Sequence, residues 1–449
     1  MPRRLWAVLA VSLGAVVAVL DGAIANVALP TIARDLGASP AASVWVVNAY
    51  QLVVTVTLLS LTSLGDIVGY RRVYRAGLLL FTLASGACAL AGSMPELVVA
   101  RVVQGLGAAG IMAVNVVLVR FIYPQALLGR GLGYNALVVA GSAALGPTVA
   151  SAILAVAGWP WLFAVNLPIG LVGLWAARAL PATQPSRHPF DVAGALLNAA
   201  VFGLLITGLD GLGHGGWHGR VAAELAGAAV LGVVLVRGQL RRPMPLLPVD
   251  LLRRPLFALA IATSACAFVA QMLAFVSLPF HLQGALGRSQ VETGLLMTPW
   301  PLAVAVAAPV AGRLADRYPA GLLGITGLSL LAAGLGLLAG LPAHPAAAAI
   351  VWRMALCGLG FGLFQSPNNR AIMTAVPRER SGGAGGMVGM ARLFGQTTGA
   401  ALVAVLLGRL GLAGSRSALV WGAGFALAGA LASGLRLAPR RWSDLPAPH

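Results

Sequence analysis

The sequence contains no lysine, and acidic side chains are scarce, with only 12 Asp and Glu among 449 residues. Charged residues make up 9% of the chain, whereas a soluble domain carries about 25%. Hydrophobic residues make up 59%, and the mean hydropathy is +0.89. This composition excludes an ordinary soluble protein and predicts an integral membrane protein.

The positive charge, which is +18 in total, comes entirely from arginine. Such a charge is also found in nucleic-acid-binding proteins, but here the arginines lie between apolar segments rather than in one basic patch. The positive-inside rule for membrane proteins accounts for this distribution better. We therefore expect membrane lipid, and no nucleic acid, as a partner.

Cysteine is also scarce, and the three residues Cys88, Cys266 and Cys357 lie far apart inside apolar runs. Neither a disulfide framework nor the spacing of metal ligands is visible. A membrane-embedded enzyme would need a cluster of acidic or histidine residues at an interface, and the sequence has none. We expect no metal and no cofactor, and we disfavour an enzyme.

Apolar runs of about 18 residues or more dominate the chain, and each is long enough to cross a bilayer core of about 30 Å. The first run is too long for a signal peptide, so we interpret it as an uncleaved first helix. An all-α protein follows, with about fourteen transmembrane helices. The predicted spans are 5–30, 43–64, 74–92, 98–120, 132–157, 161–181, 191–211, 221–238, 256–280, 291–311, 322–341, 348–370, 384–408 and 416–436.

Arginine placement orients these spans, because loops on one predicted side carry most of the positive charge. That side includes Arg3, Arg71, Arg130, Arg254 and Arg440. The asymmetry predicts that both termini are cytoplasmic, which requires an even number of spans. We expect a multi-pass monomer in a bacterial inner membrane.

The chain repeats itself weakly about 250 residues apart. Leu64-Gly65-Asp66 recurs as Leu314-Ala315-Asp316, and Arg101 with Gly105 and Gly107 recurs as Arg353 with Gly358 and Gly360. Parallel repeats of this kind build transporters whose site lies near the midplane of the membrane. We predict an N-terminal six-helix bundle (1–182), inserted helices seven and eight (183–240), a cytoplasmic connector (241–255) and a C-terminal six-helix bundle with a cytoplasmic tail (256–449).

Asp21 lies inside the first span, where an ionised carboxylate costs about 3 kcal/mol on insertion scales. Counting along the helices places both Asp21 and Arg101 of the fourth span in the outer half of the N-terminal bundle, so they could pair. Burial and a nearby arginine shift the proton affinity of a carboxylate in opposite directions. Asp21 and Arg101 are therefore either a proton-coupling pair or a static ion pair.

Five segments carry recognisable motifs: Leu20 to Pro30, Leu64 to Arg72, Arg101 to Ala109, Gly141 to Pro147 and Trp159 to Gly170. They resemble motifs of the major facilitator superfamily in its fourteen-helix drug:proton antiporter branch. The likeness spans nearly the whole chain. It implies a major-facilitator-type fold with two six-helix bundles plus an inserted two-helix hairpin.

The resemblance also assigns roles to individual residues. Asp66, placed in a short cytoplasmic loop, and Asp316, its second copy, would latch the bundles in one state. The gating residues are then Asp66, Gly69, Arg71, Arg72, Asp316 and Arg317. The antiporter motif on the fifth helix comprises Gly141, Gly146 and Pro147.

Several residues depart from the family pattern. Thr62 stands where the loop motif usually has glycine, Tyr70 where it usually has a basic residue, and Pro160 where arginine is usual. The fifth-helix motif ends in Ala150-Ser151 rather than in two glycines. These departures bear on gating and antiport, and they leave the expected fold unchanged.

Arg392 lies about 12 Å into the thirteenth span, and no C-terminal span contains an acidic residue within its core. It either contacts carbonyls and amides such as Gln365, or it meets a polar or anionic group of a substrate. Polar residues within the spans form the candidate substrate contacts. They are Asn26, Asn48, Gln104, Gln271, Gln365 and Arg392.

These features favour a proton-coupled exporter of small amphipathic organic compounds, a multidrug or metabolite efflux antiporter, that works by alternating access with the proton gradient as its energy source. A proton symporter that takes up a nutrient is the alternative within transport. A membrane-embedded enzyme, or a sensor without transport, is a weaker alternative.

Overall fold

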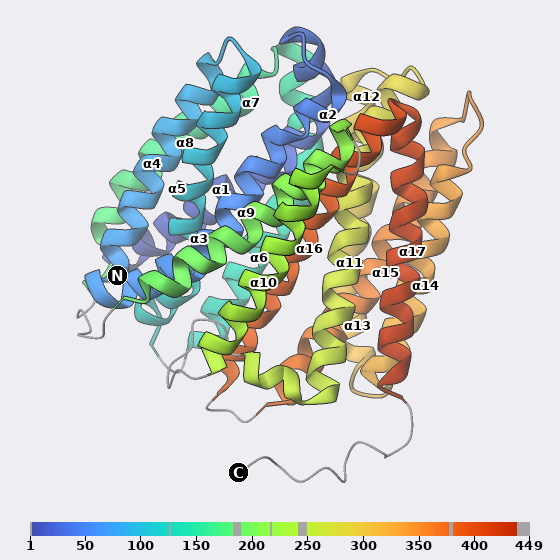
Figure 1. Ribbon diagram of the computed structural model, residues 1–449. Coiled ribbons are helices and arrows are strands. Elements are labelled where there is room, and N and C mark those ends of the chain that lie inside the picture. Colours follow the sequence, from blue (N-terminus) through green and yellow to red (C-terminus); the bar gives the residue numbers. More distant parts are fainter. Residues whose placement is uncertain are drawn as a thin grey trace. The chain divides into compact units, whose positions relative to one another are not determined.

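The computed structural model describes residues 2–124, 127–182, 190–215, 218–240, 249–376 and 380–437, and these form helices and connections without a strand (Figure 1). Fourteen helical segments of this part are long and apolar enough to span a membrane, which confirms the predicted number. The helices are α1 (Pro2–Asp35), α2 (Pro40–Ser43), α3 (Trp45–Val68), α4 (Tyr70–Leu90), α5 (Met94–Ile122), α6 (Leu128–Val156), α7 (Pro160–Ala164), α8 (Asn166–Ala176), η2 (Ala177–Ala179), α9 (Val192–Gly215), α10 (Gly219–Leu240), η3 (Val249–Arg253), α11 (Pro255–Phe280), η4 (His281–Ala285), α12 (Gln290–Met297), α13 (Pro299–Leu314), α14 (Ala320–Ala339), α15 (Ala347–Thr374), α16 (Ser381–Leu410) and α17 (Ala413–Leu435).

Several spans consist of two helical pieces, where the sequence predicted one continuous helix. Breaks at Val44, Val165 and Thr298 separate α2 from α3, α7 from α8 and α12 from α13. Proline occupies the first position of α2, α7 and α13, where its missing N–H costs no helical hydrogen bond. Each break lies in the first part of its span, and the second helical piece continues across the membrane in the same span.

Contacts divide the chain into two compact units. Unit 1 comprises Met1–Leu235, Phe275–Thr298 and Ala400–Arg416, and unit 2 comprises Val236–Ala274, Pro299–Gly399 and Ser417–His449. The predicted domain boundaries follow sequence order and stay a prediction. Part of the predicted connector (241–248) and most of the C-terminal tail (438–449) lie outside the described residues.

In unit 1, glycines of the fourth-helix motif bring α5 close to both α3 and α4 (Figure 1). A Cβ atom at Gly105 would lie 2.8 Å from the backbone oxygen of Tyr50, and one at Gly107 would lie 2.8 Å from that of Gly77. Small residues allow such close helix packing in membranes. The motif therefore shapes the helix interface.

Unit 2 repeats this packing with α13, α14 and α15. A Cβ atom at Gly358 would lie 2.7 Å from the Cβ of Ala303, and one at Gly360 would lie 2.5 Å from the backbone oxygen of Gly327. Gly105 and Gly358 thus contact the second helix of their half, and Gly107 and Gly360 contact the third. The predicted repeat is confirmed in the packing.

Two asparagines extend the correspondence. Asn115 on α5 donates from Nδ2 to the backbone oxygen of Val11 on α1 at 3.1 Å. Asn368 on α15 donates from Nδ2 to the backbone oxygen of Ala260 on α11 at 3.0 Å. The first helix of each half is therefore tied to the fourth in the same way, and α1 corresponds to α11 with an offset of about 249 residues.

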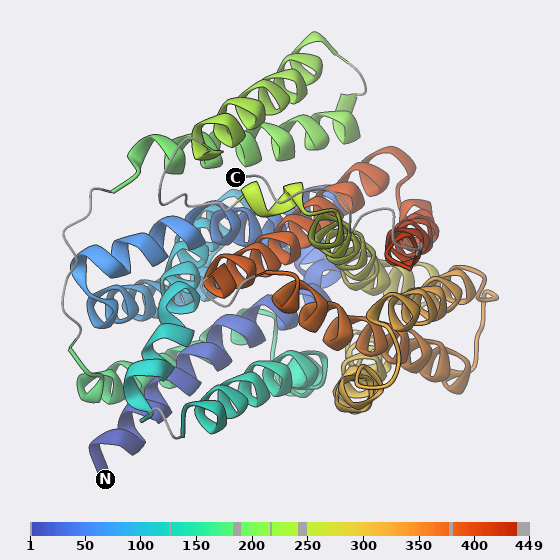
Figure 2. The ribbon, with the colours of Figure 1, turned by 90° about the horizontal axis from the view of Figure 1, so that it is seen from below.

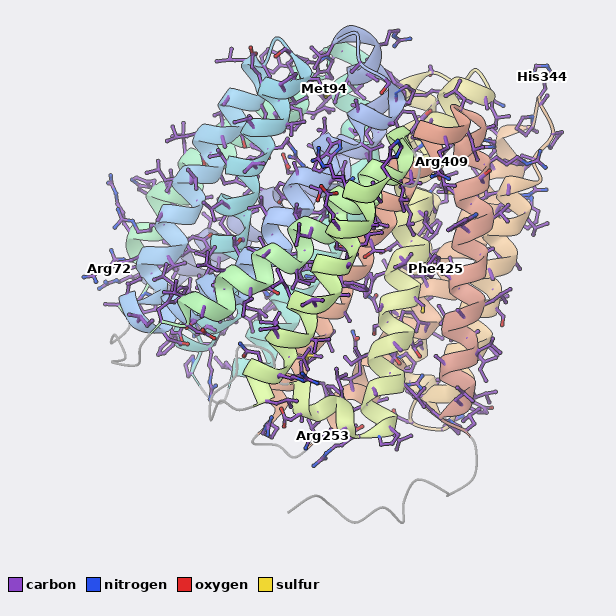
Figure 3. The ribbon with its side chains drawn as sticks, in the orientation of Figure 1. Arg72, Met94, Arg253, His344, Arg409 and Phe425 are labelled. Atoms are coloured by element: carbon purple, nitrogen blue, oxygen red, sulfur yellow. The ribbon has the colours of Figure 1, made fainter. Side chains whose placement is uncertain are left out.

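The inserted helices α9 and α10 form an antiparallel pair (Figure 2). α9 packs on α3, where Asn198 donates from Nδ2 to the backbone oxygen of Val56 at 3.0 Å. Arg409, labelled in Figure 3, donates from Nε to the backbone oxygen of Leu212 at 2.7 Å. The pair is thus attached to α3 and to the end of α16 within unit 1.

Candidate functional site: a buried carboxylate in unit 1

Asp21 on α1 is completely buried, with no exposed surface, and Arg101 on α5 is 1% exposed. Their side chains form an ion pair. Two charges so deep in a protein are stable only when their geometry and hydrogen bonds compensate the loss of water. The structure confirms the predicted pairing of Asp21 with Arg101.

Every protein contact described for the Asp21 carboxylate is a hydrogen-bond donor. Oδ1 accepts from Nε2 of Gln104 at 2.9 Å and from Nδ2 of Asn166 at 2.8 Å, while Oδ2 accepts from Arg101. An ionised carboxylate only accepts hydrogen bonds, whereas a protonated one must also donate. Its surroundings in this structure therefore match the ionised form.

Arg101 is held from several sides. Its Nε donates to the backbone oxygen of Val46 at 2.8 Å, and the guanidinium lies over the rings of Tyr50 and Phe163, at 4.2 and 5.5 Å from their centroids. Cation–π contacts are strongest where water is absent. Arg101 and its two aromatic neighbours thus form a buried, well-packed environment for the Asp21 carboxylate.

Gln104 completes the cluster, since its amide is engaged on both sides. Nε2 also donates to Oγ of Ser85 at 2.9 Å, and Oε1 accepts from Arg101 at 2.6 Å and from Sγ of Cys88 at 3.4 Å. The candidate substrate contact at Gln104 is therefore occupied by protein partners in this structure.

Sequence reasoning missed the residues that contact Asp21 or Arg101 directly, namely Asn166, Tyr50 and Phe163. Asn166 and Phe163 lie in the motif at the entry to the sixth span, which was recognised without assigning its residues a partner. Tyr50 lies on the second span and carries no motif signal. Its hydroxyl donates to the backbone oxygen of Ala18 at 2.9 Å, so it also holds α1 in place.

The antiporter motif packs α6 against α1 and α12. Gly146 faces Ala23 of α1, where a Cβ atom would overlap the alanine methyl group. A Cβ atom at Gly294 of α12 would lie 2.6 Å from the backbone oxygen of Pro147. A Cβ atom at Gly141 would have no neighbour within 4 Å among the residues that the structure describes. The motif thus acts mainly through Gly146 and Pro147.

Hydrogen bonds within unit 1 connect the two halves of the sequence. Thr31 donates from Oγ1 to Oε1 of Gln290 at 2.9 Å, and Gln283 donates from Nε2 to the backbone oxygen of Val27 at 2.9 Å. The hydroxyls of Thr148 and Thr298 lie 2.9 Å apart. α1 and α6 are therefore joined to α12 and to the end of the ninth span.

The predicted position of Asp66 in a loop is wrong, because Asp66 lies in the last turn of α3. Gly69 is the only residue between α3 and α4, and its φ of 98° suits glycine. Tyr70 donates its hydroxyl to the Asp66 carboxylate. The residue that departs from the family pattern is thus a partner of the motif aspartate.

The neighbouring arginines contact backbone oxygens. Arg71 donates from Nη2 to Arg178 at 3.0 Å, and Arg72 (Figure 3) donates from Nη1 to Val68 at 3.2 Å. These bonds satisfy carbonyl groups at the ends of helices, which lack partners within the helix itself.

The second copy of this motif is arranged differently. Asp316 forms an ion pair with Arg370 of α15. Arg317 is exposed and has no hydrogen bond or ion pair with the described residues. The partner comes from a helix far away in the sequence, so local spacing could not reveal it.

The remaining candidate contacts do not join the Asp21 cluster. Asn26 donates from Nδ2 to the backbone oxygen of Gly22 at 3.2 Å, and Asn48 is buried with no partner for Oδ1 in the described part of the chain. Gln271, Gln365 and Arg392 are partly buried, and none has a hydrogen bond to a described residue. The structure therefore gathers Asp21, Arg101 and Gln104 and leaves these residues apart.

Comparisons with known proteins agree with this architecture. The family model of the Major Facilitator Superfamily matches residues 11–400. The chain is 56% identical to the uncharacterized transporter YebQ of Escherichia coli K12, covering 98% of this chain and 97% of YebQ. It is 33% identical to the multidrug resistance protein Stp of Mycobacterium tuberculosis CDC 1551 / Oshkosh, covering 90% of this chain and 76% of Stp.

A solved structure shows the same fold. It is the crystal structure of a bacterial homolog to the human lysosomal transporter Spinster in an inward-facing and unoccupied conformation. The two chains share 14% sequence identity, are covered completely, and superpose with a TM-score of 0.67.

Proposed function

Because the chain belongs to the Major Facilitator Superfamily, we propose that this membrane transporter is a proton-coupled efflux antiporter for small amphipathic organic compounds. Asp21 takes up and releases the coupled proton, and Arg101 stabilises its ionised form. The protein works by alternating access in a bacterial inner membrane, with both termini in the cytoplasm. The similarity to Stp, which is named a multidrug resistance protein, supports this direction of transport.

The hydrogen bonds of Asp21 carry the proposal. Protonation would remove the charge that compensates Arg101 and would add a donor to a site where all described partners of the carboxylate are donors. A protonated Asp21 therefore requires a different arrangement of α1, α5 and α8. Proton uptake by Asp21 is then linked to the conformational change, as proton-coupled transport requires.

α1 provides a route from the proton site to the outer contacts. Val27 and Thr31 follow Asp21 on the same helix, about 9 and 15 Å farther along. Both residues are hydrogen-bonded to the segment that contains Gln283 and Gln290. A shift or rotation of α1 that accompanies protonation would break these bonds, and the outer end of the protein would open.

The energy source is sufficient for such a cycle. One proton that moves inward through 100 mV releases about 2.3 kcal/mol. A factor of ten in substrate concentration costs about 1.4 kcal/mol. One proton per substrate therefore sustains more than a tenfold gradient of a neutral compound.

Everted membrane vesicles test the proposal. Respiration acidifies their lumen, and a pH-sensitive dye reports the release of protons when a substrate is added outside. Candidate substrates come from a drug-susceptibility panel in an efflux-deleted host. An antiporter releases protons on substrate addition, and Asp21→Asn should abolish this release while Asp21→Glu retains part of it.

The same vesicles separate antiport from symport. A symporter would not exchange lumenal protons for an external substrate, so the dye signal would stay unchanged. Proton release at the wild-type rate by a well-folded Asp21→Asn protein would reject Asp21 as the proton carrier.

A further inference from the structure

Arg392 is a charged side chain inside a membrane span that no described residue contacts through a hydrogen bond or an ion pair. It lies on α16 in unit 2, and it is only partly buried. Unpaired ionisable groups within a membrane are costly and usually mark a functional site. The first of the two predicted alternatives, a contact with amides such as Gln365, is not observed.

Close packing fixes the position of Arg392. Gly395 and Gly399 lie on the same face of α16, three and seven residues farther along. Cβ atoms there would lie 2.7 Å from the backbone oxygen of Ala265 and 2.8 Å from that of Val269, both on α11. α16 is therefore pressed against α11 just beyond Arg392, and the arginine backbone cannot move freely.

Asn368 of α15, which lies near this depth, has hydrogen-bond partners within the protein. Asn368 donates from Nδ2 to Oγ of Ser264 at 2.8 Å and accepts at Oδ1 from Nη1 of Arg436 at 2.8 Å. Burial lowers the pKa of Arg436 to about 10, so this arginine remains a cation at neutral pH. Arg436 is thus supported by a built network that Arg392 lacks.

Other side chains near this depth also lack hydrogen bonds with the described residues. Gln365 is one turn from Asn368 on α15, and Gln396 is one turn from Arg392 on α16. Contacts of both helices with α11 place Gln365 and Arg392 within about one helical turn of each other in depth. Unit 2 therefore offers one cation and two amides to a ligand.

The repeat gives unit 2 no counterpart of Asp21 that could pair with this cation. The level of Asp21 in α1 corresponds to Ala270 and Gln271 in α11, according to the equivalent bonds of Asn115 and Asn368. Arg353, the counterpart of Arg101, donates to the backbone oxygen of Ala349 and lies over the ring of Trp352. Glu292 lies in the first turn of α12, and the core of each span of the second half contains no acidic residue.

We propose that Arg392 binds an anionic group, such as a carboxylate or a phenolate, of the transported compound, with Gln365 and Gln396 as further hydrogen-bond donors. This inference rests on the proposed transport function and names its substrate class. A guanidinium binds a carboxylate through two parallel hydrogen bonds, which gives both charge and geometric selectivity. Export of a monoanion in exchange for a proton would move two charges per cycle, so the membrane potential would drive it more strongly than the export of a neutral compound.

Binding of a matched pair of compounds to the purified full-length protein tests the inference. Isothermal titration calorimetry is performed with 1-naphthylacetate and with its neutral amide, 1-naphthylacetamide. The wild type should bind the carboxylate about tenfold more tightly than the amide, as expected for one charge-assisted contact. Arg392→Gln should remove this preference and leave the affinity for the amide unchanged.

Two further variants serve as controls. Arg392→Lys keeps the charge without the two-pronged geometry and should retain part of the preference. Arg353→Gln removes another arginine of a second-half span, one that already has a backbone partner, and should leave the preference intact. A wild type that binds the carboxylate no better than the amide, or an Arg392→Gln protein that keeps the preference, overturns the proposal. If Arg392→Gln does not fold, loss of part of the preference in Arg392→Lys supports the proposal and its full retention contradicts it.

Vesicle measurements keep this inference separate from the proposed function. Proton release with the carboxylate and the amide alike, unchanged in Arg392→Gln, would support antiport and reject the anion site. Anion-selective binding without proton release would reject antiport and support the anion site.

Discussion

Asn166 on α8 donates a hydrogen bond from Nδ2 to Oδ1 of Asp21 on α1 at 2.8 Å, across 145 residues of sequence. The carboxylate therefore accepts hydrogen bonds from side chains of the sixth span as well as of the fourth. Both carboxylate oxygens of Asp21 thus already accept hydrogen bonds. This arrangement determines what substitutions at Asp21 will do.

Asp21→Asn should destabilise the protein. The amide keeps the size of the side chain, but its NH2 group would face a donor, and Arg101 would lose its counter-charge. Removing one partner of a buried ion pair costs about 3–5 kcal/mol. We expect a lower unfolding temperature in detergent and a lower yield than for wild type.

The double variant Asp21→Asn/Arg101→Gln provides the control for this prediction. It removes the uncompensated charge, so stability should recover in part while proton-coupled export stays absent. Equal stability of the single and the double variant would show that the charge of Arg101 is not the cause.

Gly294→Val should impair transport by preventing α12 from packing on α6. A Cβ atom at Gly294 would lie 2.6 Å from the backbone oxygen of Pro147, and it would also overlap Ser151. In a variant with cysteines in place of Thr148 and Thr298, whose hydroxyls lie 2.9 Å apart, oxidation should form a cross-link. Adding Gly294→Val should reduce the cross-link about tenfold, corresponding to overpacking of roughly 1.4 kcal/mol.

Gly141→Ala is the control, because a Cβ atom there would have no neighbour within 4 Å in the described part of the chain. It belongs to the antiporter motif on α6, against which Gly294 packs, and cross-linking and transport should both remain near the wild-type level. Equal loss in both variants would mean that glycine at these two positions acts through helix flexibility rather than through packing.

Asp316→Ala should have little effect on stability, although it breaks an ion pair with Arg370. Both side chains are more than half exposed, and exposed pairs contribute about 0–1 kcal/mol. Thermal unfolding in detergent should therefore change only slightly. A clear drop in transport without a change in stability would indicate that the pair acts in the conformational cycle.

Asn198→Leu tests whether the inserted helices are peripheral to transport. The substitution removes the hydrogen bond between α9 and Val56 of α3. Because the two-fold repeat is complete without α9 and α10, export should stay within about twofold of wild type, a change of less than 0.5 kcal/mol. A change in substrate profile would place the pair near the transport route and contradict the prediction.

Composition and local pattern were enough to predict the fourteen spans and the repeat. Each span is a continuous apolar run, and the glycines of α5 and α15 recur at nearly constant spacing. The pairing of Asp21 with Arg101 was also predictable, since lone charges in apolar runs are few and depth along a helix follows from counting residues.

The other partners depended on the tertiary structure. Asn166 reaches Asp21, and Arg370 reaches Asp316, only because their helices are rotated to face those carboxylates. Rotation of a helix about its axis is set by packing against all of its neighbours, and a nearly uniform apolar sequence does not encode it. For the same reason, hydropathy places Arg392 within a span, but only the arrangement of α11, α15 and α16 leaves its guanidinium without a partner.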